Sequence, residues 1–567
     1  MTHAASAGSK RMAGSHWDEH LPAWLLGAAA LALCVFLLLP LGTLLVESFQ
    51  NDQGQFSLTR FREFAATAGM LTAIWNTLWV AAVVTLITVP LAFLYAYAIQ
   101  RACIPLTGFW RIVGLSALLG PSLVGAISFI QWFGTQGLLK FLLGDNSVYG
   151  PIGIIMATVY ASFPHALMIL VVALATVDGR LFEAADALSA SRWRKFRTVT
   201  LPGARYGLIS AALVVFSYSI SEFGIPKVIG GNFQVLAVEI YVQVVGQQNF
   251  GRGAVVALLL LAPVLVAFVL DWRVQRKQQA SLTARAVPYR PKPDWRRDLP
   301  LLVFCALMAI AMLGVLGMAA YTSFVTFWPY KLELTLSHYT YGLAEAGVLD
   351  AYLNSLKLAL LTAAVGTPFI FVTAYLVEKT KDGPAWLRPA LQAMTALPMG
   401  VPGLVLGIGY ILFFNHPDNP LNDLYRTLTI MVVANIVHYY TSCHLTALTS
   451  LKSIDREFEA VSASLKVPQY MTFWRVTLPV CLPAVLDISR YLFINAMTTI
   501  SAVVFLYSPQ TLPASVSILN LDEAGELGPA AAMATLIVLT CLVVSLLYAI
   551  AGHFLLQRHQ AWRQFKR

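Results

Sequence analysis

The sequence predicts an all-α polytopic membrane protein with about twelve transmembrane helices, built as two parallel repeats of six. Its composition, its apolar runs and an internal repeat predict this fold. Of the 567 residues, 58% are hydrophobic and only 12% are charged, whereas soluble domains carry roughly 25% charged residues. The apolar segments are long and continuous, which is typical of helices and unlike the short alternating segments of a membrane β-barrel.

A helix that crosses ~30 Å of hydrocarbon needs about 20 apolar residues, and runs of this length recur along the whole chain. We predict twelve spans, near 22–45, 72–99, 110–132, 151–177, 206–223, 254–272, 299–324, 354–377, 389–414, 427–449, 486–507 and 530–556. Because each half contributes six spans, both halves insert in the same orientation. Both termini then lie on the same side of the membrane.

The distribution of positive charge orients these spans. The net charge of +10 would by itself be compatible with nucleic-acid binding. Of the 38 Lys and Arg residues, however, only eight fall on one side of the predicted topology: Arg60, Arg62, Lys140, Lys227, Arg252, Lys331, Lys357 and Arg426. Cytoplasmic loops carry the excess of Lys and Arg. We therefore predict that both termini are cytoplasmic and that nucleic acid is not a partner.

The two halves repeat each other in sequence. WNTLWVAAVVTLITVPLAFLYAYAIQR (75–101) aligns without a gap to LNSLKLALLTAAVGTPFIFVTAYLVEK (353–379), so that Pro90 matches Pro368, 278 residues later. We predict a first half over 1–272 (core 72–272), a basic, proline-containing cytoplasmic linker over 273–298, and a second half over 299–567 (core 354–556). Parallel repeats around an axis along the membrane normal suit a pathway between them.

Two predicted cytoplasmic loops have similar sequences. Residues 183–202 read EAADALSASRWRKFRTVTLP, and residues 459–479 read EAVSASLKVPQYMTFWRVTLP. In each loop a carboxylate opens a short helix, where the helix dipole favours it, and small residues follow that let another surface approach closely. The Leu-Pro at the end suits the start of the next membrane helix, because Pro is tolerated at the first helical position.

This pattern resembles the EAA loop of bacterial ABC importer permeases, the coupling loop that grips the ATPase. The resemblance implies coupling loops at 181–202 and 457–479 and the type I importer fold. It assigns ATPase coupling to Glu183, Ala184, Ala185, Ser189, Leu201, Pro202, Glu459, Ala460, Leu478 and Pro479. Ser189 stands where the family usually has Gly. In the second loop the spacing from Glu459 to Pro479 is one residue longer, and Leu465 and Lys466 stand where Gly is expected.

The resemblance also implies the partners. Two copies of a cytoplasmic ABC ATPase would dock on the two loops, and a periplasmic binding protein would deliver a small solute. The chain has no Gly-Lys dipeptide and therefore no phosphate-binding GxxxxGK[ST] loop. We expect no cofactor and no enzymatic activity in this chain, since ATP and Mg²⁺ would be used by the ATPase. The expected location is the bacterial inner membrane, surrounded by lipid.

Two residues are candidates for the solute pathway. Glu222, in SYSISEFGIP, lies near the external end of the fifth span, and a carboxylate at membrane depth is a functional candidate by default. The equivalent residue of the second half is Thr499. The alternative is that Glu222 is a solvated loop residue. His438, Cys443 and His444 lie at an irregular spacing without a carboxylate nearby, which favours packing over a metal site.

Helix-breaking residues gather in the third span of each half. They are Pro121, Pro398 and Pro402, with Gly120, Gly400, Gly403, Gly407 and Gly409. Such breaks are tolerated where backbone lines a cavity, although close helix packing would explain them equally well. A pair one helical turn apart, Asp487 and Arg490, predicts a local ion pair.

Three stretches of the second half look most like permeases for 2-aminoethylphosphonate: FFNHPDNPLN (413–422), FEAVSASLKVPQYMTFWRVTLP (458–479) and NAMTTISAVVFLYSP (495–509). The resemblance therefore implies phosphonate uptake, with ferric iron, thiamine or another small solute as alternatives. An ion-coupled secondary transporter is disfavoured, because the first, third, seventh, ninth and twelfth predicted spans carry no charged residue at their centres. A membrane enzyme is disfavoured because no catalytic constellation is evident.

Overall fold

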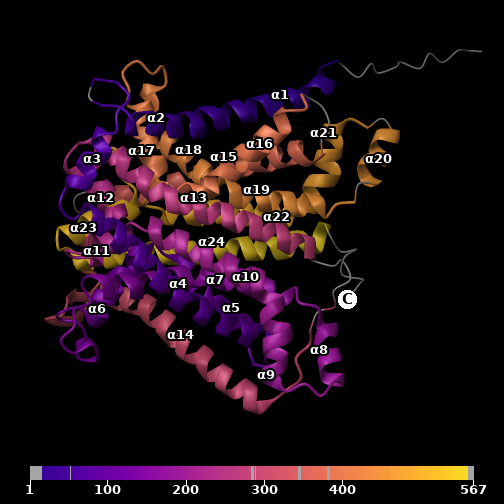
Figure 1. The fold of residues 1–567 in the computed structure, drawn as a ribbon, viewed down its shortest axis with the longest axis horizontal. Helices are drawn as coiled ribbons and strands as arrows, with labels where there is room; N and C mark the ends of the chain where they lie inside the picture. Colours follow the sequence, from indigo (N-terminus) through magenta and orange to yellow (C-terminus); the bar gives the residue numbers. More distant parts are fainter. Residues whose placement is uncertain are drawn as a thin grey trace, which may run out of the picture.

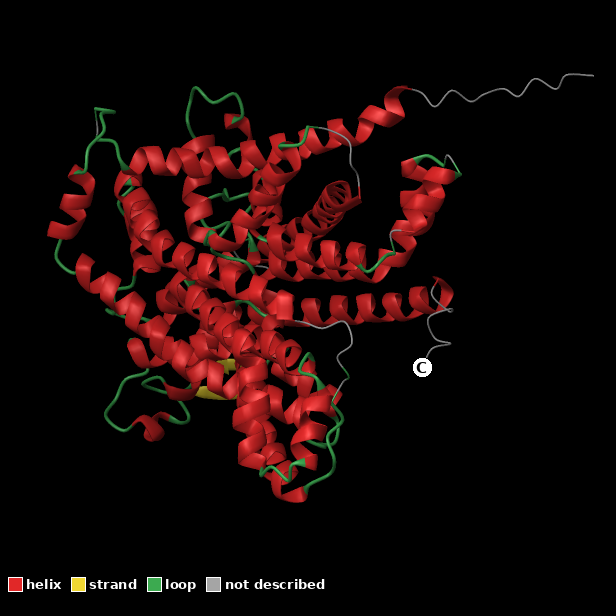
Figure 2. Cartoon of the chain, turned by 45° about the vertical axis from the view of Figure 1, so that its right-hand side comes forward, coloured by secondary structure: helices red, strands yellow, loops and turns green. Residues whose placement is uncertain are grey.

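The structure is a computed structural model that describes residues 16–51, 53–281, 287, 289–342, 347–379, 384–455, 457–465 and 467–559. The side chains of 16–20, 278–281, 459, 463 and 556–559 are also outside the described part. Within it nearly everything is helical, and the strands are a single short antiparallel pair, β1 (Val325–Phe327) and β2 (Lys331–Leu334) (Figure 2). The predicted all-α fold is confirmed.

The longest helices lie roughly side by side along one direction (Figure 1). Those of the first half and the linker are α1 His16–Leu33, α2 Leu39–Ser48, α3 Thr59–Ala66, α4 Met70–Arg101, α5 Thr107–Gly114, α6 Ser122–Phe133, α7 Pro151–Ala175, α8 Gly179–Ala187, α9 Arg192–Lys195, α10 Leu201–Ser221, α11 Gly224–Ile229, α12 Leu236–Tyr241 and α13 Phe250–Ser281. Those of the second half are α14 Trp295–Ser323, α15 Val348–Lys379, α16 Leu387–Ala396, α17 Gly403–Phe414, α18 Leu428–His438, α19 Tyr440–Lys452, α20 Glu457–Ser464, α21 Gln469–Thr472, α22 Leu478–Thr498, α23 Ala514–Glu523 and α24 Leu527–His559.

Short turns of tighter or wider helix join these elements. The π-helical turns are Cys34–Leu38, Phe196–Thr200, Val242–Gly246, His338–Gly342 and Phe473–Thr477, and the 3₁₀ turns are Ser116–Leu119, Lys140–Leu143, Leu397–Gly400 and Asn422–Leu424. The π-helical turns Phe196–Thr200 and Phe473–Thr477 are equivalent in the two halves and directly precede α10 and α22.

Nine helical stretches of the described residues are long and apolar enough to cross a membrane. They are Leu21–Ser48, Met70–Arg101, Pro151–Ala175, Arg192–Ser221, Phe250–Lys277, Trp295–Ser323, Val348–Lys379, Gln469–Thr498 and Leu527–Leu555. They match nine of the twelve predicted spans. The span predicted at 486–507 is wrong at its second end, because its helix ends at Thr498. The apolar residues that follow, such as Val503 and Leu506, are buried within the protein rather than exposed to lipid.

The other three predicted spans are each made of shorter helices. Span 110–132 is divided between α5 and α6, span 427–449 between α18 and α19, and span 389–414 bends by 114° between α16 and α17. Pro lacks an N–H and disfavours the helical conformation of the preceding residue. Accordingly Gly120 and Val401, which precede Pro121 and Pro402, are both extended. The predicted breaks are confirmed.

The sequence repeat reappears as a repeated hydrogen bond. The hydroxyl of Thr77 on α4 accepts from the backbone N–H of Leu236 at 2.9 Å, where α12 begins. The hydroxyl of Ser355 on α15 accepts from the backbone N–H of Ala514 at 2.7 Å, where α23 begins. The asparagine before each hydroxyl residue donates to a backbone carbonyl shortly before the same helix. Each long helix therefore holds the corresponding short helix in the same way.

The first helix of each half packs on the other half. The α1–α2 stretch lies along α15 to α18 (Figure 1), and the Tyr410 hydroxyl donates to the carbonyl of Phe36 at 2.7 Å. In exchange, α14 lies along α4 to α6, and Trp132 donates its ring N–H to the carbonyl of Gly314 at 3.2 Å. This exchange interlocks the two halves.

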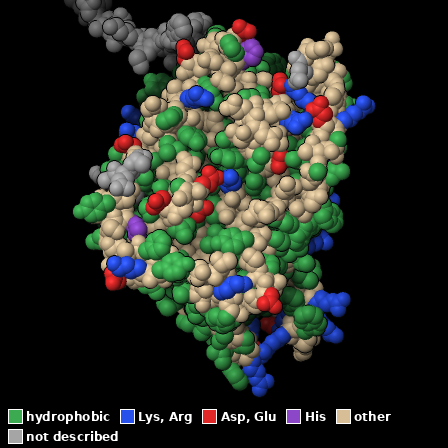
Figure 3. All heavy atoms as spheres, turned by 90° about the vertical axis from the view of Figure 1, so that its left-hand side faces the viewer, with side chains coloured by type: hydrophobic (Ala, Val, Ile, Leu, Met, Phe, Trp, Pro, Cys, Tyr) green, Lys and Arg blue, Asp and Glu red, His purple; other side chains and the backbone are tan. Residues whose placement is uncertain are grey.

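The halves also meet at the end of the molecule opposite α8 and α20. Lys227 of α11 and Glu523 of α23 form an ion pair of 2.7 Å. Burial, and then the charge of Glu523, raises the pKa of the neighbouring Asp522 to about 6. Viewed from this end, acidic and basic side chains are scattered among apolar ones (Figure 3). The ion pair joins the halves on the face where the sequence predicts the periplasm.

The repeated hydrogen bond can be tested by Thr77→Val. This substitution keeps the shape of the side chain but leaves the buried N–H of Leu236 without its acceptor, which costs about 1–3 kcal/mol. We expect a lower thermal unfolding midpoint of the purified protein in detergent. Thr85→Val is the matched control, because the Thr85 hydroxyl donates to Ala81 within the same helix. Equal shifts in the two variants would contradict this role for Thr77.

Candidate functional site

The first predicted coupling loop is a pair of short helices, α8 and α9, joined by a tight turn. The side chain of Asp178 accepts a hydrogen bond from the backbone N–H of Arg180 at 3.0 Å and so caps α8. Ser189 ends the helix with a φ of +53°, and the N–H of Ala190 donates to the carbonyl of Ala185 at 2.9 Å. This left-handed position is the one that glycine adopts without steric cost. The left-handed backbone explains why glycine is expected at the position that Ser189 occupies.

The second loop repeats this construction with α20 and α21. The side chain of Asp455 accepts from the N–H of Glu457 at 3.2 Å. The N–H of Val467 donates to the carbonyl of Ser462 at 2.9 Å, as Ala190 does in the first loop. The residue between Leu465 and Val467, which would match Ser189, lies outside the described residues.

The two loops have the same length. Their capping aspartates are 277 residues apart, as are Pro202 and Pro479. The counterpart of Glu183 is therefore Ala460, and Glu459 lies one position earlier on its helix. The spacing from Glu459 to Pro479 is one residue longer because the glutamate lies one position earlier, not because the loop itself is longer. The backbone of Glu459 lies in α20, but its side chain is outside the described part.

Both loops expose large apolar side chains at equivalent positions. Leu181 and Leu188 are 53% and 81% exposed, and their counterparts Phe458 and Leu465 are 54% and 70% exposed. Glu183 and Ala184 are exposed on the same short helix, and Ala185 is half-buried. Exposed apolar groups that recur at matching positions indicate a contact surface. In Figure 1, α8 and α20 both stand at the right-hand end of the molecule.

Each loop continues directly into a long helix. Leu201 and Pro202 begin α10, and Leu478 and Pro479 begin α22, as the sequence predicts. Both helices have 21 residues. The residue after α10 is Glu222 and the residue after α22 is Thr499, and both are extended. The two predicted pathway residues therefore lie at equivalent ends of the two helices that leave the loops.

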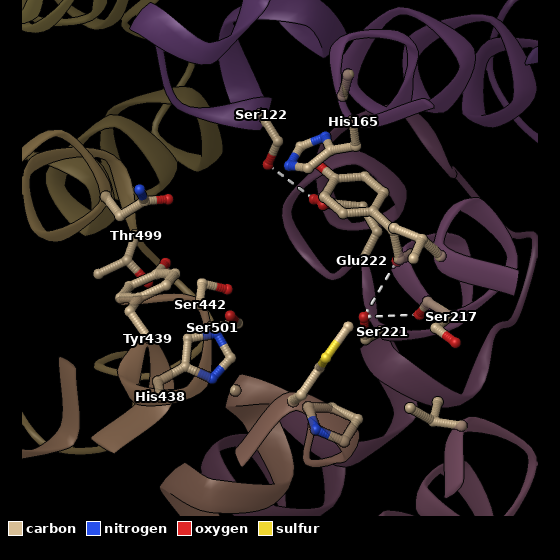
Figure 4. A pocket seen from close by; sticks show the side chains of 18 of the residues that line it. Ser122, His165, Ser217, Ser221, Glu222, His438, Tyr439, Ser442, Thr499 and Ser501 are labelled. Atoms are coloured by element: carbon tan, nitrogen blue, oxygen red, sulfur yellow. Dashed lines mark hydrogen bonds between the residues drawn. The ribbon is translucent and has the colours of Figure 1, made fainter. Parts of the chain in front are cut away.

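Glu222 and Thr499 face the same cavity of about 370 Å³ between the two halves (Figure 4). Residues on both sides of the helix breaks at Pro121 and Pro402 line this cavity. The first half contributes, among others, Ser122, His165 and Glu222, and the second half His438, Tyr439 and Thr499. A helix can be interrupted at membrane depth where its backbone lines such a cavity. The breaks therefore belong to the cavity wall.

Hydrogen bonds fix the carboxylate of Glu222 in this wall. The Ser122 hydroxyl donates to Glu222 Oε1 at 2.7 Å, and the backbone N–H of Ile225 donates to the same oxygen at 3.3 Å. Both donors are neutral groups. Asp271 is a second carboxylate in the lining. Lys and Arg do not occur among the described residues that line this cavity.

The histidines take different positions. His165 and His438 line the cavity, and the Nδ1 atom of each is buried without a hydrogen-bond partner among the described residues. Cys443 and His444 are buried within the second half. In the described part of the chain, His, Cys, Asp and Glu form no cluster that could hold a metal ion. Asp487 and Arg490 form the predicted ion pair, at 3.2 Å.

Sequence reasoning missed Ser122 and His165 as cavity residues. Ser122 directly follows Pro121 at a predicted break, and His165 is an ionisable residue within the fourth predicted span. Both signals were available, because polar residues at membrane depth usually face a cavity or the interior of the bundle.

Comparison with protein families decides the class. The model of the binding-protein-dependent transport system inner membrane component family matches residues 109–279 and 366–555. The chain belongs to this family. The two matched ranges agree with two repeats in one polypeptide, each containing one of the paired loops.

Several relatives extend over most of the chain. The ferric transport system permease protein FbpB of Actinobacillus pleuropneumoniae is 26% identical over 550 residues, covering 94% of this chain and 78% of its own. The probable ABC transporter permease protein y4fN of Sinorhizobium fredii is 22% identical over 535 residues, covering 91% of this chain and 92% of its own. The sulfate transport system permease protein CysW of Escherichia coli is 23% identical over 267 residues, which is 45% of this chain and 90% of its own.

The chain is thus a multi-pass inner-membrane permease subunit of a binding-protein-dependent ABC importer, and such pore subunits are not enzymes. The family implies an ATPase and a solute-binding protein as partners. The named relatives support ferric transport, one of the alternatives, more than the phosphonate uptake expected first.

Proposed function

We propose that this permease carries ferric iron into the cell, powered by two copies of an ABC ATPase that dock on the two loops. ATP and Mg²⁺ are used by the ATPase, and a periplasmic binding protein delivers the solute. Both chain termini then lie in the cytoplasm with the loops. Similarity to ferric permeases over most of this chain supports the choice of solute.

The observation that carries the transport mechanism is the direct connection between each loop and the cavity. α10 and α22 each start at a loop and end beside a cavity residue, Glu222 or Thr499. At 1.5 Å per residue, a helix of 21 residues spans about 32 Å. A helix moves as a rigid element, so a displacement of the loop reaches the cavity wall. ATP-driven closure of the ATPases would bias the permease between its two states.

The charge of the cavity also supports a cationic solute. Two acidic side chains, Glu222 and Asp271, line the cavity, and no lining residue of the described part is Lys or Arg. Opposite charges attract more strongly in a low-dielectric site than in water. A wall with acidic side chains and neither Lys nor Arg favours a cation over a phosphonate. Thiamine, which is also a cation, is the second candidate that this charge favours, and 2-aminoethylphosphonate is the least favoured.

Coupling can be tested by exchanging Glu183 and Glu459 together for Lys. Both glutamates belong to the loop helices, and the exchange reverses the sign of one charge in each loop. We expect ATP-dependent uptake in proteoliposomes to fall at least about tenfold, while membrane insertion is unchanged. Glu526→Lys is the control, because Glu526 is exposed at the opposite end of the molecule. Undiminished uptake in the double variant would refute the coupling role.

The solute can be tested by reconstituting the permease with its ATPase and binding protein. We expect ATP hydrolysis to be stimulated by the binding protein loaded with ferric iron. Glu222→Gln removes a cavity charge and should lower iron uptake roughly tenfold, or about 1.4 kcal/mol. Asp487→Asn is the control, since it removes a carboxylate that is paired with Arg490 on the exposed side of α22. Stimulation by 2-aminoethylphosphonate and not by iron would overturn the proposal.

A further inference from the structure

We propose that the linker between the two halves is a strut that fastens the first coupling loop to the membrane helices, so that the two ATPase docking sites are mechanically different. The strut is formed by the described linker residues 287 and 289–294. The inference rests on the proposed coupling function of the loops. It adds a positioning role for residues that neither contact the solute nor lie on the exposed face of the loop.

The linker first pairs with the start of α8. The N–H of Gly179 donates to the carbonyl of Val287 at 2.8 Å. The N–H of Val287 donates in return to Asp178 Oδ1 at 3.3 Å. The same oxygen accepts from the N–H of Arg180 and caps the helix. One carboxylate therefore orients both the loop helix and the linker.

Gly179 leaves room for this close approach. A Cβ atom at this position would lie 3.0 Å from the carbonyl oxygen of Val287 and 3.1 Å from the Cα of Tyr289. Both are backbone atoms, which yield less readily than the end of a flexible side chain. In the sequence of the second loop the equivalent residue is Arg456, so the glycine that allows this close approach in the first loop is not repeated there.

A cluster of Arg101 with two aromatic rings that pack on each other makes the second contact. The guanidinium of Arg101, at the end of α4, lies 4.8 Å from the ring centroid of Phe182 on α8 and 4.9 Å from that of Tyr289 in the linker. The two ring centroids are 4.4 Å apart. Arg101 is buried and also donates to the carbonyl of Leu174 at the end of α7, at 2.5 Å. Cations are attracted to ring faces, most strongly where water is excluded.

The third contact reaches the other helix of the loop. Arg192, the first residue of α9, forms an ion pair of 2.5 Å with Asp294 of the linker. Because Arg192 is largely exposed, this pair adds little energy by itself. Its position matters more, since the linker thereby touches both short helices of the loop.

The second loop lacks the residues for an equivalent cluster. The counterparts of Arg101 and Phe182 are Lys379 and Glu459. A lysine has no planar guanidinium to pack against rings, and a glutamate has no ring. A force on the first loop therefore reaches α4, α7 and α10 together, through Arg101 and the linker. The second loop continues into α22, and Lys379 at the end of α15 donates to the carbonyl of Ile454, just before α20, at 3.4 Å.

Hydrogen exchange on the full-length permease in nanodiscs tests the strut without any partner. We expect Tyr289→Ala to accelerate exchange of the α8 amides about tenfold, and to leave the α20 amides unchanged. Tyr289→Phe keeps the ring and should retain protection. Tyr330→Ala, an exposed tyrosine in the β1–β2 turn, is the control for loss of an aromatic side chain. Unchanged α8 exchange, or equal acceleration in both loops, would overturn the proposal.

The consequence for transport is measured separately in proteoliposomes with the ATPase and binding protein. Tyr289→Ala and Gly179→Ala should lower the uptake per ATP hydrolysed about threefold, whereas Tyr289→Phe should restore it. Undiminished uptake per ATP in both variants would overturn the positioning role. If the loops do not dock an ATPase at all, the proposed function fails while the exchange result still stands, so the two failures are distinguishable.

Discussion

In the hydrocarbon of a membrane, a peptide group without a hydrogen bond is costly, so a helix can be interrupted only where protein or water covers the break. The arrangement of this permease depends on that constraint. Its interrupted helices meet between the two halves, and the extended residues Gly120 and Val401 lie beside the same cavity. The lipid-facing helices remain long and continuous. The location of the proposed solute pathway thus follows from where the backbone can be open.

The interlocked halves explain how a distant loop can act on this cavity. The exchange of α1–α2 and α14 ties each half to the other, and the repeated bonds of Thr77 and Ser355 fix α12 and α23 to the long helices. α10 and α22 then cross from the loops to the cavity without interruption. The symmetry is only approximate. Glu222 faces Thr499 across the cavity, and the linker contacts the first loop.

Much of this architecture could be predicted because it follows from local chemistry. The repeat, the helix breaks and the starts of α10 and α22 depend on proline, glycine and apolar runs that can be read directly. The end of α22 could not be predicted, because hydropathy does not distinguish contact with lipid from burial in the protein interior. Val503 and Leu506 are apolar because they are buried in the protein. The grouping of Ser122, His165 and His438 also escaped prediction. These residues come from segments far apart in sequence, and only tertiary packing brings them together.

The central claim is that one polypeptide supplies both docking sites of the importer. Native mass spectrometry of the permease purified with its ATPase in nanodiscs tests this claim most directly. One 61.9 kDa chain bound to two ATPase subunits is the expected complex. A complex of one chain with one ATPase subunit, or of two chains sharing two ATPase subunits, would contradict it.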